Sequence, residues 1–557
     1  MAVGAVLWVP GAAFGNGLEL LPGGTRAAGR AGAVAARPTD PMAMVHNPAG
    51  LPRLSGDQVM LNLDLPRDYM CVQPYGYYGW GVYVSPISEP TSEFGDPTDQ
   101  DGNGYPERLL DQVCNDVPLL PIPQIAWTFH LTESLSLGLG MVAPTLVAGL
   151  QYGPKDGTLA TDEGPRPTPT RYQMLHQEVI FGLNPTVSVA YRFMDALSAG
   201  LTLHIGMAKA NVYAVSTLYA GTQPSDDILS KVTAEDYFIP GITASLHSEP
   251  LPGLSLMASA RIVDDFSGPG ELTMTTNYYH QGAEGDNEAP HKNPPVRLQN
   301  ITVGTPWAVT AAARYAYLRP GAEQVGREGG DPLATELFDI EVDVTLNLTE
   351  RSDRNRVSVG DDINLQFRVA DGTPSDMIKV SKEELQDFVS ERHLKNSIAL
   401  RLGGSFNPIP DLLGFSAGVF YESRGIEPAY ASIESFAFRR LGVGMGAVVR
   451  LGSFDLLASY SHIFGEELEV APPPHAPRSE GSADPTSGFD KRIYRDGELT
   501  EGPVEDPRAP DPDDADAVAR FQQVAAASLA DRRARVVNAG RYTASFDVFS
   551  VGVVYRY

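Results

Sequence analysis

A short acidic stretch has the residue types and spacing of a calcium-binding loop. Oxygen-bearing side chains stand at alternate positions, followed by glycine at the sixth position. The first three ligands would be Asp99, Asp101 and Asn103. The twelfth position, where such loops carry a bidentate glutamate, is Leu110, so Glu107 or Asp111 would have to replace it. A calcium site and a solvated acidic turn both fit this pattern.

The chain has two cysteines, Cys71 and Cys114. In an oxidising compartment such a pair predicts a disulfide, which here would staple the first long loop. Two buried free thiols are the alternative. The sequence has no Cys-x-x-Cys element and no Cys/His cluster, so it gives no indication of zinc.

Catalytic chemistry is not indicated. A lipid hydrolase would need a nucleophile, a histidine and an orienting group close in space, but the ten histidines are scattered without a nucleophile motif. We therefore expect no enzyme and no required cofactor, with calcium the one ion that the sequence indicates. A formal net charge of −27 argues against binding to nucleic acid.

Strict alternation of apolar and polar residues predicts the architecture. From Phe338 to Thr349 every second residue is apolar, and the intervening positions include Asp339, Glu341 and Asp343. Because successive side chains of a strand point to opposite faces, one face suits lipid and the other a wet lumen. Twelve residues at ~3.3 Å each span an outer membrane even when tilted. A soluble sandwich edge is the alternative, but the pattern recurs up to the final Tyr557, which favours a barrel.

Reading this alternation along the chain gives about fourteen strands, joined by short turns at one end and long loops at the other. The prediction is an all-β protein in which residues 56–557 form an antiparallel transmembrane β-barrel with long extracellular loops. An even strand count places both termini in the periplasm. Within one of the loops, Ser381 to Glu384 resembles a capping box and predicts a short helix to Arg392.

The first fifty-five residues are unlike the wall. Residues 1–15 resemble the apolar part of a secretory signal, but the first basic residue is Arg26, so we expect a truncated signal cleaved after Gly15. Residues 16–55 are too rich in small side chains to form a wall strand. A segment of this length ahead of a barrel is predicted to fold back and plug the lumen.

The residues of this segment resemble the N-terminal hatch of the FadL-type long-chain fatty acid transporters, a family that includes toluene and aromatic hydrocarbon channels. The resemblance rests on Gly29-Arg30-Ala31-Gly32-Ala33, on Asp40 and on Asn47-Pro48-Ala49-Gly50-Leu51. Residues 137–144, 401–405 and 537–542 support it, so that it extends over essentially the whole chain.

The resemblance implies a fourteen-stranded barrel closed by the hatch in the outer membrane of a Gram-negative bacterium. Ligand would be captured outside, enter an apolar pocket and leave through the wall beside a kinked strand. Asn47, Pro48 and Ala49 would anchor the hatch. The kinked strand would cover residues 135–147, which carry Gly138, Gly140 and Pro144. Alternatively, Pro144 only marks the strand end.

The expected function is passive uptake of long-chain fatty acids or other hydrophobic small molecules by a multi-pass monomer in contact with outer-membrane lipid and lipopolysaccharide. A surface structural or adhesion barrel that uses its long acidic loops is the alternative. Five strand arginines are expected to pair with the acidic stripe at Asp339, Glu341 and Asp343: Arg192, Arg261, Arg314, Arg401 and Arg450.

Overall fold

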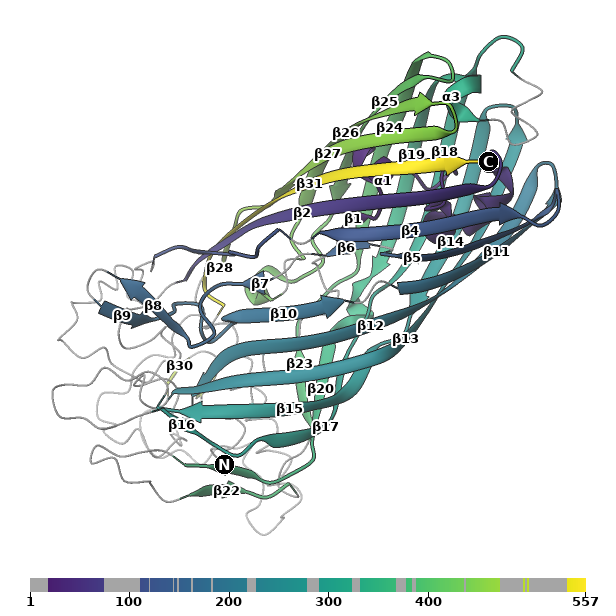
Figure 1. The fold of residues 1–557 in the computed structure, drawn as a ribbon. Helices are drawn as coiled ribbons and strands as arrows, with labels where there is room; N and C mark the ends of the chain where they lie inside the picture. The colour runs from purple at the N-terminus through teal and green to yellow at the C-terminus, as the bar shows by residue number, and fades with distance from the viewer. Residues whose placement is uncertain are drawn as a thin grey trace.

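The computed structural model describes residues 19–74, 111–119, 121–143, 145–147, 150–161, 164–181, 184–217, 227–277, 290–322, 331–366, 377–382, 387–434, 437–470, 494–495, 498–499 and 538–557. These residues form one tall β-barrel (Figure 1). Neighbouring wall strands are antiparallel throughout, which matches the prediction from the sequence. The first and last wall strands, β2 (Gln58–Pro74) and β31 (Gly540–Arg556), pair along their full length and so close the barrel.

Fourteen positions make up the circumference, and at five of them two consecutive strands form one interrupted wall strand. In order after β2 the wall strands are β4 (Ile122–His130), β5 (Leu135–Val142), β10 (His176–Phe181) with β11 (Asn184–Met194), β12 (Leu197–Thr217), β13 (Asp227–Leu251), β14 (Leu254–Val263) with β15 (Phe266–Thr276), β17 (Val296–Val303) with β18 (Trp307–Leu318), β19 (Glu336–Leu348) with β20 (Arg354–Val359), β23 (Phe388–Glu391) with β24 (Ser397–Ile409), β25 (Leu413–Glu422), β26 (Arg440–Leu451), β27 (Phe454–Gly465) and β31.

Short elements accompany the wall. The strands are β1 (Glu19–Pro22), β3 (Val113–Cys114), β6 (Thr145–Val147), β7 (Leu150–Gln151), β8 (Thr158–Thr161), β9 (Gly164–Pro167), β16 (His291–Lys292), β21 (Ile363–Leu365), β22 (Ile378–Val380), β28 (Leu468–Val470), β29 (Tyr494–Arg495) and β30 (Glu498–Leu499). The helical turns are α1 (Thr25–Gly29), α2 (Ala43–His46), η2 (Pro48–Arg53), α3 (Pro332–Thr335), η6 (Thr349–Ser352) and η7 (Pro428–Tyr430). Among the described residues, no helix is long and apolar enough to cross a membrane.

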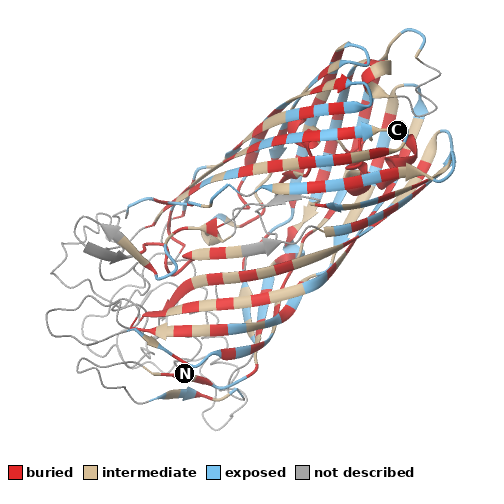
Figure 2. Ribbon diagram, viewed as in Figure 1, coloured by how far each residue is buried: buried red, intermediate tan, exposed pale blue. Residues whose placement is uncertain are grey.

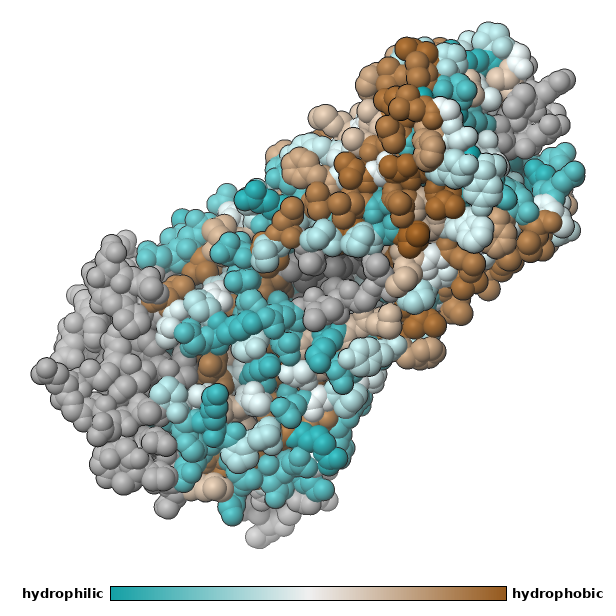
Figure 3. Space-filling model, in the orientation of Figure 1, coloured by the Kyte–Doolittle hydropathy of each residue, from teal (hydrophilic) through white to brown (hydrophobic). Residues whose placement is uncertain are grey.

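Alternation along each strand produces the outward apolar belt that a membrane requires. In β19, Ile340 and Val342 are about half exposed, whereas Glu341 is fully buried. Figure 2 shows this as stripes of buried and exposed residues along the strands. Every wall position contributes an exposed apolar side chain: Leu61, Ile125, Leu139, Val189, Leu203, Leu246, Leu256, Val309, Val342, Leu402, Val419, Val443, Leu456 and Val551. These side chains belong to the half of the barrel that carries the C-terminus, where Figure 3 shows hydrophobic surface.

The other half of the barrel continues beyond the belt with a reversed character. Its visible outer surface is largely polar (Figure 3), and its interior is a large apolar cluster that includes Val232, Phe266 and Leu298. Several strands are interrupted where the two halves meet. Aspartate side chains bridge these interruptions by accepting backbone N–H groups of the next strand: Asp236 from Ser267 (2.9 Å), Asp265 from Thr305 (3.1 Å) and Asp353 from Leu394 (2.6 Å).

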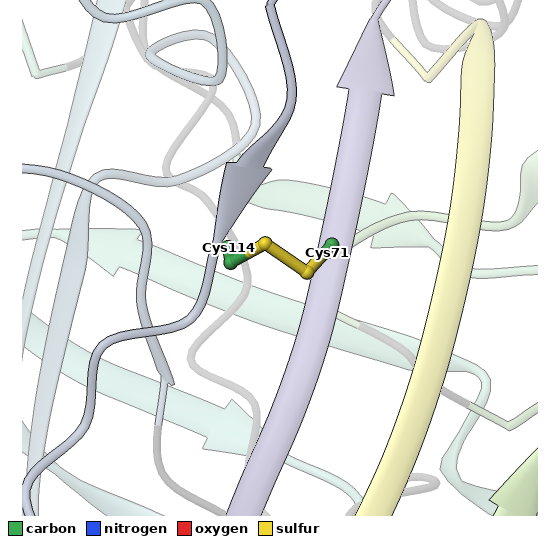
Figure 4. The surroundings of a disulfide bond; sticks show 2 residues. All are labelled: Cys71 and Cys114. Atoms are coloured by element: carbon green, nitrogen blue, oxygen red, sulfur yellow. A yellow bond between two sulfur atoms is a disulfide. The ribbon is translucent and has the colours of Figure 1, made fainter.

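Two loop expectations have different outcomes. Cys71 on β2 and Cys114 on β3 lie opposite each other in the sheet and form a disulfide (Figure 4). The helix expected up to Arg392 is wrong for its second half, because Phe388–Glu391 is strand β23 and pairs with β20. A short helix has a costly nucleus, whereas a neighbouring wall strand offers the backbone a ready partner.

Candidate functional site: the leading segment and the gap in the wall

Residues 19–54, here called the leading segment, lie inside the barrel (Figure 1). Its α1 turn packs against β26 and β27, and its η2 turn packs against β11 and β12 on the far side of the circumference. Glycines in the wall permit this close approach, because a Cβ atom at Gly418 or Gly200 would overlap backbone atoms of the segment. The segment therefore fills the lumen at the level of the apolar belt.

Arg30 is the electrostatic centre of this packing. Its side chain is 1 % exposed and donates from Nη1 and Nη2 to the two oxygens of Asp339, at 3.1 and 2.9 Å. The same Nη2 donates to Glu341 at 2.9 Å. A bidentate pair of this kind fixes orientation as well as providing energy. Removing Arg30 would leave the buried Glu341 without this ion-pair partner, while Asp339 would keep Arg314.

Backbone N–H groups of the leading segment donate hydrogen bonds to carboxylates of the acidic stripe. Ala36 donates to Glu341 at 2.6 Å, and Ala35 donates to Asp343 at 3.1 Å. Of the five strand arginines, Arg314 reaches the stripe, with Nε 2.9 Å from Asp339. Arg450 instead pairs with Asp455 and Asp331, near the end of the barrel that carries the C-terminus. The leading segment, through Arg30, and the wall, through Arg314, thus both supply counter-charge to the stripe.

The Asn-Pro-Ala element binds the wall through β12 and β13. Asn47 Nδ2 lies 2.9 Å from His247 Nδ1, and Ser245 donates to Asn47 Oδ1 at 3.2 Å. Ala49 donates its N–H to Ser245 at 2.8 Å, while its carbonyl accepts from Ser198 at 2.6 Å. Pro48 lies directly over Gly200. The element thus has polar contacts on both of its sides.

Two glycines of the leading segment that the sequence singled out, Gly29 and Gly32, also lie against the wall. Gly29 meets Gly446 of β26, and Gly32, with φ of +86°, meets Arg401 of β24. A side chain at Gly32 would be strained as well as crowded. Sequence reasoning missed the wall side of these contacts, above all Ser245 and His247. Alternation places such residues on the inner face, but it does not say what they touch.

Among the described residues, the strand pairing of the wall is interrupted after β5, and we call this interruption the gap. Up to Val142 this strand pairs with β4 on one side and β11 on the other. The chain then leaves the wall, because β6 pairs with β1 of the leading segment instead of with a wall strand. At Leu150 the chain returns and β7 pairs with β10. Gly138 and Gly140 lie in the paired part of β5, before this departure, and Pro144 lies outside the described residues.

A chain of hydrogen bonds joins the departure point to the leading segment. Ala143 donates its N–H to Gln124 Oε1 at 2.8 Å, and Gln124 Nε2 donates to Asp64 at 2.6 Å. The same carboxylate accepts the backbone N–H of Gly24 at 3.2 Å. The position at which the strand turns inward is therefore linked by hydrogen bonds to the position of the leading segment in the lumen.

The apolar interior of the other half of the barrel, away from the C-terminus, adjoins the leading segment. Besides the wall, inward-folded elements line it, namely β1 with Leu20 and Leu21, the β21–β22 hairpin, and the residues after η7 with Ile433 and Phe438. Its arginines carry counter-charges, since Arg171 pairs with Asp227 at 3.0 Å.

The calcium prediction is not tested by this geometry. Its proposed ligands Asp99, Asp101, Asn103 and Glu107 lie outside the described residues. Within the part of the chain that the structure does describe, no group of three or more His, Cys, Asp or Glu side chains is arranged to hold a metal ion. The signal expected at residues 1–15 lies outside it as well.

Comparison with known proteins places the fold. No family model and no curated protein sequence matches the chain. Among solved structures, a Pseudomonas aeruginosa FadL homologue has a TM-score of 0.60 at 13% identity, over 97% of this chain and 99% of that one. The Pseudomonas putida toluene transporter TodX has a TM-score of 0.53 at 13% identity, over 97% of this chain and 100% of its own. The Ralstonia pickettii toluene transporter TbuX reaches 0.50 at 12% identity, over 99% and 100%.

Proposed function

We propose that this chain, which has the fold of the FadL-type barrels, is an outer-membrane transporter for passive uptake of long-chain fatty acids or other hydrophobic small molecules. The observation that carries the proposal is the departure of the chain from the wall after Val142. That departure lies next to the apolar interior, since the inward-turned β6 pairs with β1, whose Leu20 and Leu21 belong to the interior cluster.

The polarity of the two halves supports a side exit. In the belt half the lumen is occupied by the leading segment and its buried ion pairs, which offer a hydrophobic molecule no favourable surroundings. The interior of the other half is apolar, and burial there stabilises a ligand by about 25 cal/mol per Å² of apolar surface. From that interior the gap after β5 gives a path to the acyl chains of the membrane without passage through the polar lumen.

The other parts of the molecule take their roles from this path. Residues 16–55 would act as the plug and residues 56–557 as the barrel, with extracellular loops for capture and both termini in the periplasm. The protein would work as a monomer without a cofactor. The acidic loops on which the adhesion alternative depends, at 89–116 and 480–516, lie largely outside the described residues.

Uptake by cells tests the proposal. A Gram-negative host without its own fatty acid transporter would receive the full chain, and uptake of labelled oleate and labelled toluene would be measured separately. The account expects faster uptake of at least one of them. Deletion of residues 24–49 should also make vesicles leaky to small hydrophilic solutes. Equal uptake with and without the chain, for both compounds, would contradict the proposal.

A further inference from the structure

Outward-facing cations gather along one edge of the apolar belt. They lie where β19, β24, β25 and β26 leave the belt on the side away from the C-terminus, and we call them the cationic band: Arg351, Arg354, Arg356, Lys395, Arg424 and Arg439. Five carboxylates accompany them: Asp265, Glu350, Glu391, Glu427 and Glu466. Asp264, Asp353 and Glu467 lie next to these residues in the chain, so cations and carboxylates are interspersed here, whereas the chain as a whole has 42 Lys+Arg against 69 Asp+Glu.

The cationic band begins where the exposed apolar side chains end. Lys395 is followed by Ile398, which is 47% exposed, and Arg439 is followed by Leu441, which is 51% exposed. Trp307 marks the same level, because Arg351 lies 4.5 Å above its ring. Tryptophan and arginine are characteristic of the boundary between hydrocarbon and headgroups. The cationic band therefore lies at the depth of lipid headgroups.

Ion pairs hold these cations in place. Glu466 is shared by Arg424 and Arg439, whose nitrogens approach it at 3.1 and 3.4 Å, so two guanidinium groups meet one carboxylate. Arg356 stands directly opposite two uncharged residues, Thr302 and Val389. Arg354 and Arg439 have side chains that are 71% and 56% exposed, so a ligand can reach them.

We propose that the cationic band binds the phosphate groups of a lipid A-type glycolipid in the outer leaflet. Guanidinium groups match phosphate with parallel hydrogen bonds, and each basic residue at an anionic membrane surface adds to binding. The belt directly below would receive the acyl chains, which an inorganic anion does not have. This inference uses the outer-membrane location from the proposed function and is independent of the transported ligand.

The place of the cationic band on the circumference gives it a role. The order of strand pairing puts β24 and β25 across the barrel from the gap after β5. A glycolipid held there would anchor the barrel in the outer leaflet on the side opposite the gap. The side on which the strand leaves the wall would stay clear of a tightly bound lipid.

Binding of defined lipids to the purified full chain tests this inference. The variant combines Arg354→Gln, Arg356→Gln and Arg439→Gln. The control combines Lys155→Gln, Lys209→Gln and Lys231→Gln, which lie before β10, on β12 and on β13, away from the cationic band. Lys155 and Lys209 are also ion-paired and partly exposed. The unmodified chain, the variant and the control would be delipidated and checked for barrel folding by heat-modifiable gel mobility. Each would then be titrated in detergent with bisphosphorylated lipid A, with dephosphorylated lipid A and with inorganic phosphate.

We expect bisphosphorylated lipid A to bind the variant about tenfold or more weakly than the unmodified chain, and the control within about twofold. Dephosphorylated lipid A should bind all three proteins alike. Unchanged lipid A affinity in the variant would overturn the inference, and so would an equal loss in the control or competition by inorganic phosphate at similar concentration. Because no transported ligand is present, these outcomes do not depend on uptake.

Discussion

Arg30→Met should release the leading segment from the wall without unfolding the barrel. The substitution leaves an unbranched apolar side chain but removes the guanidinium group that meets Asp339 and Glu341 at 2.9 Å. Because Glu341 is buried and loses its ion-pair partner, while Asp339 keeps Arg314, the substitution is expected to cost about 3–5 kcal/mol. At 1.36 kcal/mol per tenfold change, the ratio of seated to unseated segment falls by roughly two to four powers of ten.

The assay is leakage of a small hydrophilic dye from proteoliposomes, together with thermal unfolding in detergent. Leakage should rise strongly in Arg30→Met, while the unfolding temperature changes little because the hydrogen bonds between wall strands remain. In the double variant with Asp339→Asn the second substitution should cost less than it does alone, since the two side chains form one pair. Tight vesicles with Arg30→Met, or fully additive effects, would refute the reasoning.

Three further predictions follow from the contacts of the wall. Gly200→Val places a side chain where Pro48 lies, so leakage should rise, whereas Leu201→Val on the lipid face should leave vesicles tight. Gln124→Leu removes the link between the departing strand and the leading segment, at a cost of about 1–3 kcal/mol; uptake of hydrophobic ligand should fall several-fold, and unchanged uptake would count against a role for this link. Cys71→Ser should abolish the reductant-dependent gel shift expected of the unmodified chain, and a shift that persists would contradict the disulfide.

The wall was predictable from sequence because its signal is local. Alternation in β19 alone separates a lipid face with Ile340 and Val342 from an inner face with Glu341, and the structure keeps that separation. The helix expected before Arg392 failed for the opposite reason. Its capping pattern is also local, but the conformation of Phe388–Glu391 is set by pairing with β20, which lies about thirty residues earlier in the chain.

The candidate site was predictable only in part. Small residues and the Asn-Pro-Ala element identified the leading segment, and the acidic stripe identified an inner face. The partners of that stripe were not predictable, because the strand arginines and Arg30 carry the same charge and only the fold brings Arg30 to Asp339. The strand departure after Val142 likewise depends on a distant partner, β1, which no pattern within residues 135–147 reveals.

Photo-crosslinking with a hydrophobic ligand tests the central claim most directly. A fatty acid and a small aromatic hydrocarbon, each carrying a diazirine, would be bound to the full chain in membranes, activated by light and located by mass spectrometry. The account predicts adducts on the apolar interior and on residues 140–151, where the strand leaves the wall. Adducts confined to the polar lumen beside Arg30, or scattered evenly over the lipid-facing belt, would contradict it.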